Sequence, residues 1–119
     1  MELIYSDKRI KEVCTDTRAA TKLFGGNKQL AIKLHARVNQ LEEAVILRDI
    51  ITIKNLRFHA LHGDREGYFA IDVKTHKEPW RIIIQPLDEN EEPYMPCNID
   101  QISGKVRIVE ISEVSKHYE

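Results

Sequence analysis

The spacing of the apolar residues changes from helical to strand-like near the middle of this 119-residue chain. Between residues 28 and 45 the apolar side chains recur every three or four positions and form one stripe: Leu30, Leu34, Val38, Leu41 and Val45. From residue 68 onward, β-branched and aromatic residues gather in short runs instead. The first spacing is typical of an amphipathic helix and the second of β-strands. The change predicts an α+β fold in which helices precede most of the strands.

The first half is expected to form a short strand followed by a helical hairpin. Residues 2–5 are strand-like, and the apolar residues of 8–23 recur at helical spacing. Gly25 and Gly26 end that helix, because glycine adopts the left-handed backbone conformation that closes many helices. The second helix covers residues 28–45, and the short glycine turn between the two predicts an αα-hairpin.

The second half is expected to form three strands in series. They cover residues 68–73, 80–85 and 105–114. The polar segment 74–79 fits a hairpin loop, the proline-containing segment 86–103 fits a long loop, and residues 46–52 fit a short turn of helix. The predicted order is β-α-α-β-β-β, with two helices packed on one face of a small antiparallel sheet. The opposite face of that sheet is then available for function.

Composition and charge predict a single cytoplasmic domain over residues 1–119. No apolar run approaches the ~20 residues that span a bilayer, and the N-terminus lacks the basic-then-hydrophobic pattern of a signal peptide. Cys14 and Cys97 are expected to be reduced thiols. The net charge of −1 gives no strong signal for nucleic acid, although much of the negative charge lies in one run, residues 88–92. That run is expected to form a solvated loop; the alternative is that it folds over a basic site.

Residues that can transfer protons or bind phosphate gather around residue 60 and in the strands that follow. Histidines and tyrosines can act as general acids and bases, and arginines can stabilise charge on a phosphate. Together they match the requirements of metal-independent RNA cleavage, in which the 2′-hydroxyl attacks the phosphate. The candidate catalytic residues are His59, His62, Arg81, His117 and Tyr118. The candidate RNA-contacting residues are Arg57, Arg65, Trp80 and Lys105.

Several of these candidates also have a purely structural interpretation. Trp80 is expected to lie in the core, with stacking on an RNA base as the alternative. Arg81 can instead form a structural ion pair, and Arg65 can pair locally with Asp64 or Glu66. The histidine–tyrosine pair near the C-terminus can belong to a frayed end. Two histidines alone are too few for a zinc site, which uses four ligands, so neither a metal nor a cofactor is expected.

The stretch from Phe58 to Ile71, followed by Trp80 to Ile84, resembles the HigB branch of the RelE/ParE toxin superfamily. Members carry the pattern His-x-Leu-x-Gly-Asp-Arg-x-Gly, then a Trp-Arg-Ile strand, then a last strand ending in Tyr and His. The resemblance implies a RelE-like fold and a ribosome-dependent messenger-RNA interferase. It also implies a cognate antitoxin, HigA-like and of the helix-turn-helix type, as partner, and no membrane partner.

The resemblance can be carried over to single residues of this chain. His59 matches the active-site histidine of the family, and Arg81 matches the strand arginine that contacts the scissile phosphate. His62 falls where a relative has a lysine, so a fixed cation is replaced by a group that is largely neutral at pH 7. His117 and Tyr118 match the terminal Tyr/His pair in type but in swapped order.

Two other functions remain open from the sequence. The same superfamily includes non-enzymatic inhibitors of DNA gyrase, and a ParE-like inhibitor would not require His59. The replacement at His62 and the altered C-terminus also fit an inactive member that survives as a binding partner. If the chain does act on RNA, its net charge of −1 predicts weak and salt-sensitive attachment to ribosomes.

Overall fold

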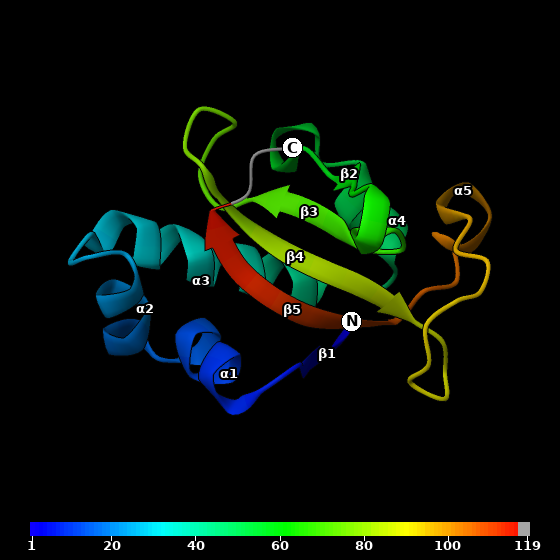
Figure 1. The fold of residues 1–119 in the computed structure, drawn as a ribbon, viewed down its shortest axis with the longest axis horizontal. Helices are drawn as coiled ribbons and strands as arrows, with labels where there is room; N and C mark the ends of the chain where they lie inside the picture. The colour runs from blue at the N-terminus through cyan, green and yellow to red at the C-terminus, as the bar shows by residue number, and fades with distance from the viewer. Residues whose placement is uncertain (117–119) are drawn as a thin grey trace.

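The structure of the protein, a computed structural model, describes residues 1–116 (Figure 1). The elements are, in order, β1 (Glu2–Tyr5), α1 (Lys8–Thr15), α2 (Thr17–Leu23), α3 (Lys28–Glu43), α4 (Leu47–Ile51), the 3-10 helix η1 (Lys54–Leu56), β2 (His59–Ala60), the 3-10 helix η2 (Gly63–Arg65), β3 (Phe69–Asp72), β4 (Trp80–Leu87), α5 (Ile99–Ile102) and β5 (Ile108–Lys116). Over this part of the chain, no helix has the length and apolar character needed to cross a membrane. The candidate site residues His117 and Tyr118 lie outside the described residues.

The five strands form one sheet in the order β1-β5-β4-β3-β2. β5 lies between β1 and β4, parallel to β1 and antiparallel to β4. β3 and β2 add antiparallel strands on the other side of β4. The predicted α+β class is therefore confirmed, but the sheet is mixed rather than wholly antiparallel. The difference arises because the first strand of the chain pairs with the last one, and the local spacing of residues carries no signal for such a long-range pairing.

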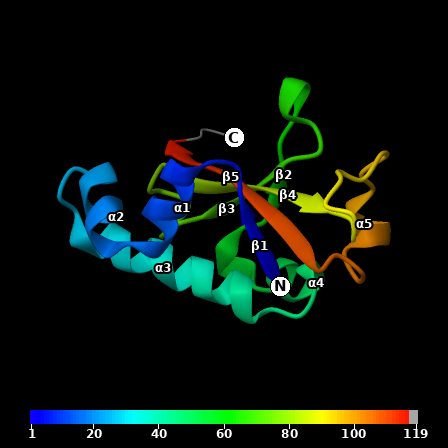
Figure 2. The same ribbon diagram turned by 90° about the horizontal axis from the view of Figure 1, so that it is seen from below.

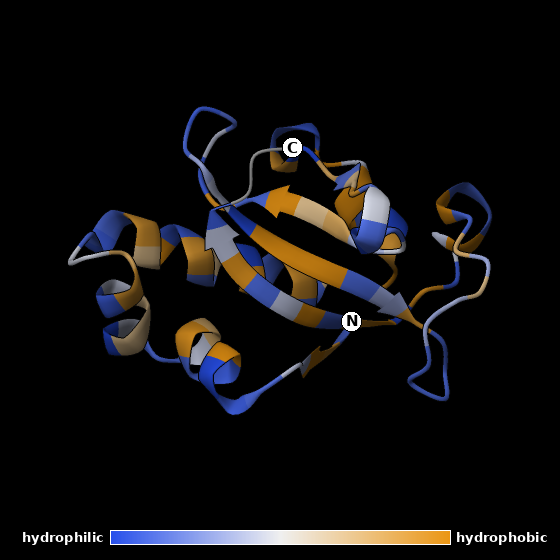
Figure 3. Cartoon of the chain, viewed as in Figure 1, coloured by the Kyte–Doolittle hydropathy of each residue, from blue (hydrophilic) through white to orange (hydrophobic). Residues whose placement is uncertain are grey.

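The main core lies between α3 and one face of the sheet (Figures 1 and 2). Leu34 and Leu41 of α3 are fully buried in one cluster with Ile82 of β4 and Ile111 of β5. Figure 3 shows the same division by hydropathy: the middle of β4 is apolar, and the loops at the ends of the sheet are hydrophilic. The apolar stripe expected in the second helix is therefore the surface that joins α3 to the sheet.

We call the sheet face opposite α3 the outer face. Directly opposed residues of neighbouring strands share a face, and the strand pairing assigns to the outer face Ala70, Asp72, Arg81, Ile83 and Glu113. In Figure 2, α3 lies below the sheet, and the segment from β2 to η2 rises above it on the outer side. We call this segment, residues 59–67, the arm. Leu61 anchors the arm, because it is buried against the outer face in a second, smaller cluster.

The helix predicted over residues 8–23 is in fact two helices, separated at Asp16. Asp16 has an extended backbone (φ −120°, ψ 120°), and its Oδ2 accepts a hydrogen bond from Ala19 N–H at 3.2 Å. An aspartate side chain in this position caps the start of α2, and this competes with continuation of α1. The prediction of one continuous helix was wrong because a regular apolar spacing on both sides of Asp16 hides the cap between them.

The second half differs from the predictions in the short strand β2, which the predicted order β-α-α-β-β-β lacks, and at the ends of its other strands. β4 continues through Pro86, which is tolerated because β3 pairs with β4 only as far as Ile84 and needs no N–H from the proline. The predicted loop over 86–103 contains the last residues of β4 and the short helix α5. β5 begins and ends later than the predicted strand over 105–114. The short helical turn predicted for 46–52 is confirmed as α4.

The acidic run 88–92 forms a turn directly after β4. Asp88 Oδ1 accepts hydrogen bonds from Asn90 N–H at 2.8 Å and from Glu92 N–H at 3.0 Å. Most of the run is exposed, and it lies at the opposite end of β4 from Arg81. These contacts agree with the solvated loop expected from the sequence and give no support to a loop that folds over the outer face near Arg81.

Cys14 is expected to resist thiol reagents in the folded protein, whereas Cys97 reacts. Cys14 of α1 is 3% exposed, and burial raises the pKa of its thiol to about 12. Cys97 is only half-buried, although burial raises its pKa as well. Because the thiolate is the reactive form, labelling at about pH 8 should modify one thiol in the native wild type. In the Cys97→Ser variant, no thiol should be labelled rapidly until denaturant is added. Rapid labelling of Cys14 in this variant would mean that α1 opens in the native state.

Candidate functional site

A buried carboxylate on the outer face binds two arginines. Asp72, at the end of β3, is 0% exposed. Arg57 donates to it with two nitrogens, from Nε to Oδ2 at 2.9 Å and from Nη2 to Oδ1 at 3.3 Å. Arg81 places its Nε 3.1 Å from Asp72 Oδ1, at ion-pair distance but poorly aligned for a hydrogen bond. β3 and β4 create this arrangement, because Asp72 and Arg81 are direct cross-strand partners.

The terminal nitrogens of Arg81 are bound to the loop between β3 and β4. Nη1 donates to the backbone carbonyl oxygens of Thr75, Glu78 and Trp80, and Nη2 donates to that of His76 at 3.0 Å. The residue is 4% exposed. Arg81 therefore forms the structural ion pair that the sequence left open, and the expectation that its guanidinium faces a scissile phosphate is not met. This pairing could not be predicted from the sequence, because nothing local marks Asp72 as the partner of Arg81.

Arg57 is the exposed arginine of this group. Its side chain is 42% exposed, whereas Asp72 and the Arg81 side chain are 0% and 5% exposed. Two guanidinium groups share one carboxylate, so the group has a net charge of +1 that is presented to solvent through Arg57. A fixed, forked cation of this kind suits a phosphate group. Of the two arginines bound to Asp72, Arg57 is the one that presents its guanidinium to solvent.

His59 follows Arg57 by two residues and is oriented by the Arg57 backbone. It is half-buried on β2, opposite Ala70, and its Nδ1 lies 2.6 Å from the carbonyl oxygen of Arg57. A carbonyl oxygen only accepts hydrogen bonds, so Nδ1 must carry a hydrogen. In the neutral ring, Nε2 then holds the lone pair, which is what a general base requires. The pairing of β2 with β3 therefore places this base on the outer face, the same sheet face as Asp72, which holds Arg57.

A second polar group lies across the sheet from His59. Arg65 of η2 forms an ion pair with Glu113 of β5, with Nη2 2.6 Å from Oε1. Both side chains are more than a third exposed, and with Tyr68 they line a cavity of about 250 Å³. Of the two partners expected for Arg65, neither Asp64 nor Glu66 forms an ion pair with it among the residues described. The arm therefore bends over the outer face and is joined to β5 by a charged contact.

The histidine that follows on the arm does not share this orientation. Leu61 points into the small cluster on the outer face, and His62 is exposed with an extended backbone (φ −123°, ψ 173°). Successive side chains of an extended segment point in opposite directions. His62 is therefore directed away from the outer face, and the structure does not bring it to His59.

Two of the expected RNA contacts lie elsewhere in the fold. Trp80 packs edge-on against Phe24 at a ring separation of 4.9 Å on the α3 side of the sheet, as expected for a core residue. Lys105 lies over the ring of Tyr94 and borders a cavity of about 530 Å³ that also includes Leu87. Leu87 ends β4 and Trp80 begins it, so Lys105 is at the far end of the sheet from the His59 group.

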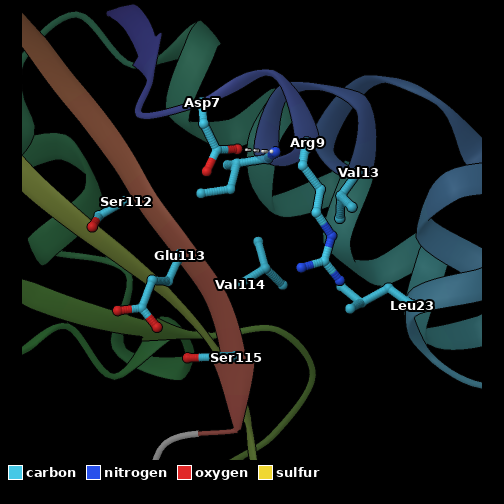
Figure 4. A pocket seen from close by; sticks show the side chains of 9 residues that line it. Asp7, Arg9, Val13, Leu23, Ser112, Glu113, Val114 and Ser115 are labelled. Atoms are coloured by element: carbon cyan, nitrogen blue, oxygen red, sulfur yellow. Dashed lines mark hydrogen bonds between the residues drawn. The ribbon is translucent and has the colours of Figure 1, made fainter.

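A further cavity of about 340 Å³, which the sequence did not suggest, lies between α1 and β5. Figure 4 shows Arg9 extending between Leu23 and Val114, while the Glu113 carboxylate points to the other side of β5. Asp7 is engaged at its edge as the cap of α1, because Oδ1 accepts a hydrogen bond from Ile10 N–H at 2.8 Å. The cavity therefore combines the Arg9 guanidinium with a lining of both polar and apolar side chains.

The chemistry of the outer face suits phosphate and proton transfer. Over residues 1–116, no cluster of three or more histidine, cysteine, aspartate or glutamate side chains could hold a metal ion. The polar groups on this face are a histidine with a defined tautomer, an exposed arginine fixed by a buried carboxylate, and an arginine–glutamate pair. Histidine can move a proton, and arginine can stabilise a negative charge.

Of the comparisons with known proteins, only the one with solved structures bears on the fold. No protein-family model and no curated protein matches the chain. Among solved structures, the chain is similar to a YoeB/ParE toxin from Agrobacterium tumefaciens, with a TM-score of 0.54 and 10% sequence identity over 99% of this chain and 100% of that one. At this identity the likeness shows a shared fold. It bears out the expected toxin-type α+β architecture and does not distinguish the HigB branch from other branches.

Proposed function

We propose that the chain is the toxin of a toxin–antitoxin pair and an endoribonuclease that cleaves messenger RNA on the ribosome without a metal ion. The toxin-type fold supports the first part. The second part is carried by one observation, the contact between His59 Nδ1 and the Arg57 carbonyl beside a guanidinium held on Asp72. The HigB-like sequence pattern around His59 supports the same assignment.

The proposed reaction uses the 2′-hydroxyl of the RNA as nucleophile. His59 Nε2 accepts the 2′-hydroxyl proton, and the 2′-oxygen attacks the adjacent phosphorus. The phosphorus–5′-oxygen bond breaks, leaving a 2′,3′-cyclic phosphate and a 5′-hydroxyl. Arg57 stabilises the negative charge that builds up on the non-bridging oxygens. A second acid donates a proton to the leaving 5′-oxygen, and His117 and Tyr118 are the candidates for it from the sequence.

The ribosome and an antitoxin complete the proposal. With a net charge of −1, the chain has few spare positive charges for binding RNA unaided, so the ribosome would hold the messenger in place. A helix-turn-helix antitoxin would neutralise the toxin in the cytoplasm. Arg65 would contribute a second phosphate contact at its own end of the outer face, in exchange for Glu113.

The test is a cleavage assay with programmed ribosomes, followed by mapping of the 5′ ends. We expect wild-type protein to cut ribosome-bound messenger, and His59→Ala and Arg57→Ala to reduce the rate by about 100-fold or more. His76→Ala is the matched control. His76 is exposed in the β3–β4 loop, so this variant should cleave messenger at the wild-type rate. His62→Ala is likewise expected to remain active, since this side chain is directed away from the outer face.

Two results would contradict the proposal. Folded wild-type protein that leaves ribosome-bound messenger intact would exclude the enzyme, and a gyrase supercoiling assay would then separate an inhibitor from an inactive member of the fold. The metal-independent mechanism would be excluded if ribosome complexes kept assembled by polyamine lose cleavage when EDTA is added and regain it when metal is restored.

A further inference from the structure

We propose that Asp72 is a positioning residue that, through Arg57, fixes both the phosphate-facing guanidinium and the tautomer of His59. The catalytic consequence rests on the proposed function, whereas the structural consequence for His59 does not. Asp72 is fully buried and touches no substrate in the proposed reaction, so it acts only through its neighbours. A continuous series of contacts joins the β3–β4 loop to His59. The loop binds Arg81, Arg81 pairs with Asp72, Asp72 binds the Arg57 side chain, and the Arg57 carbonyl contacts His59.

The first step is the immobility of Asp72 itself. The residue belongs to β3 and pairs with Arg81 across the sheet. Arg81 in turn donates to backbone carbonyls of the β3–β4 loop and is 4% exposed. A carboxylate held between two strands and a bound guanidinium offers Arg57 a fixed point of attachment.

The second step is the side chain of Arg57. Asp72 binds it through both Nε and Nη2, at 2.9 Å and 3.3 Å. A two-point contact between a planar guanidinium and a carboxylate fixes the orientation of the plane as well as its position. The rest of the guanidinium stays in solvent, because the Arg57 side chain is 42% exposed. An RNA phosphate would therefore meet a cation whose direction is already set.

The third step is the backbone of Arg57. Its φ of 50° and ψ of 49° lie in the left-handed region of backbone conformation. Residues other than glycine adopt this region only at an energetic cost. Such a conformation persists where the surroundings hold it. The side-chain contact with Asp72 supplies that hold, and the Arg57 N–H donates to Lys54 O at 3.1 Å. The same conformation directs the Arg57 carbonyl at His59 Nδ1, 2.6 Å away.

Together these steps join the cation and the base through one residue. If the carboxylate of Asp72 is removed, Arg57 loses its attachment and its backbone can leave the left-handed region. The carbonyl then turns away from His59, and the hydrogen bond that keeps the hydrogen on Nδ1 is lost. Loss of the Asp72 carboxylate thus changes the base as well as the cation.

The test is ¹⁵N-detected NMR of the His59 ring at about pH 8, where an ordinary histidine is neutral. We expect wild type to show the Nδ1–H tautomer of His59 alone, and Asp72→Asn to show both tautomers. Arg57→Gly and Arg57→Ala form a matched pair, since both remove the guanidinium but only glycine adopts a positive φ readily. Arg57→Gly should keep the Nδ1–H tautomer, and Arg57→Ala should lose it.

The activity assay adds a second readout. A histidine base in the wrong tautomer can lose a factor of up to about 10⁴ in kcat, so Asp72→Asn should lower kcat by at least about 10-fold. A pure Nδ1–H tautomer in both Asp72→Asn and Arg57→Ala would overturn the inference even if the wild type cleaves RNA. Absence of cleavage with the expected tautomers would overturn the proposed function and leave the role of Asp72 in fixing His59 intact. If Asp72→Asn does not fold, the Arg57 pair decides, because Arg57 is partly exposed.

Discussion

Replacing Arg81 with alanine is expected to lower the free energy of unfolding by about 3–5 kcal/mol, the range found when one partner of a buried ion pair is removed. In this variant Asp72 loses the partner directly opposite it in the sheet and keeps only Arg57, whose side chain is 42% exposed. The carbonyl oxygens of the β3–β4 loop lose their donors as well. Urea denaturation followed by circular dichroism measures the change, with the slope of the transition as a check on two-state behaviour.

Arg57→Ala is the matched control, because it removes the other arginine from the same carboxylate. Its side chain is 42% exposed, so solvent screens its charge, and Asp72 keeps Arg81 as partner. We expect a loss of about 1 kcal/mol or less. Equal losses in the two variants would contradict the assignment of Arg81 as structural and Arg57 as functional. Arg81→Lys should recover only part of the stability, since an ammonium cannot reach the carboxylate and the loop carbonyls together.

Leu61→Ala is expected to destabilise the protein by about 2–4 kcal/mol, as for other buried leucines. Leu61 is 1% exposed and belongs to the small cluster with Ala70 and Ile83 that fixes the arm to the outer face. The apolar cluster on the outer face is small, so truncation of Leu61 also weakens the attachment of the arm that carries His59. The same denaturation experiment gives the free energy, and limited proteolysis should show faster cutting within the arm.

Ile32→Ala serves as the control for Leu61→Ala. Ile32 lies on the solvent-exposed side of α3 and is 64% exposed. Truncating its side chain therefore creates no cavity in the folded protein. The expected change is within about 0.5 kcal/mol. A loss for Leu61→Ala no larger than that of Ile32→Ala would show that the arm is not anchored by Leu61.

The sequence by itself determined the parts of this protein that depend on neighbouring residues. The apolar stripe of residues 28–45 predicted α3, and the β-branched runs predicted β3, β4 and β5, because helix and strand periods are properties of short segments. The same local pattern around His59 pointed to the segment that forms one side of the candidate site. The error at Asp16 also had a local cause. Asp16 is the N-cap of α2, and the spacing of apolar residues alone does not distinguish such a cap from a polar residue within one helix.

Only the tertiary structure decided which residues meet across the sheet. Asp72 and Arg81 face one another through the register of β3 and β4, and Arg65 pairs with Glu113 because the arm bends back over β5. The parallel pairing of β1 with β5 joins the two ends of the described chain. Register and strand order follow from packing the whole sheet on α3, and no short stretch of sequence encodes them. For this reason the sequence identified the histidine of the site, whereas the choice between Arg57 and Arg81 needed the fold.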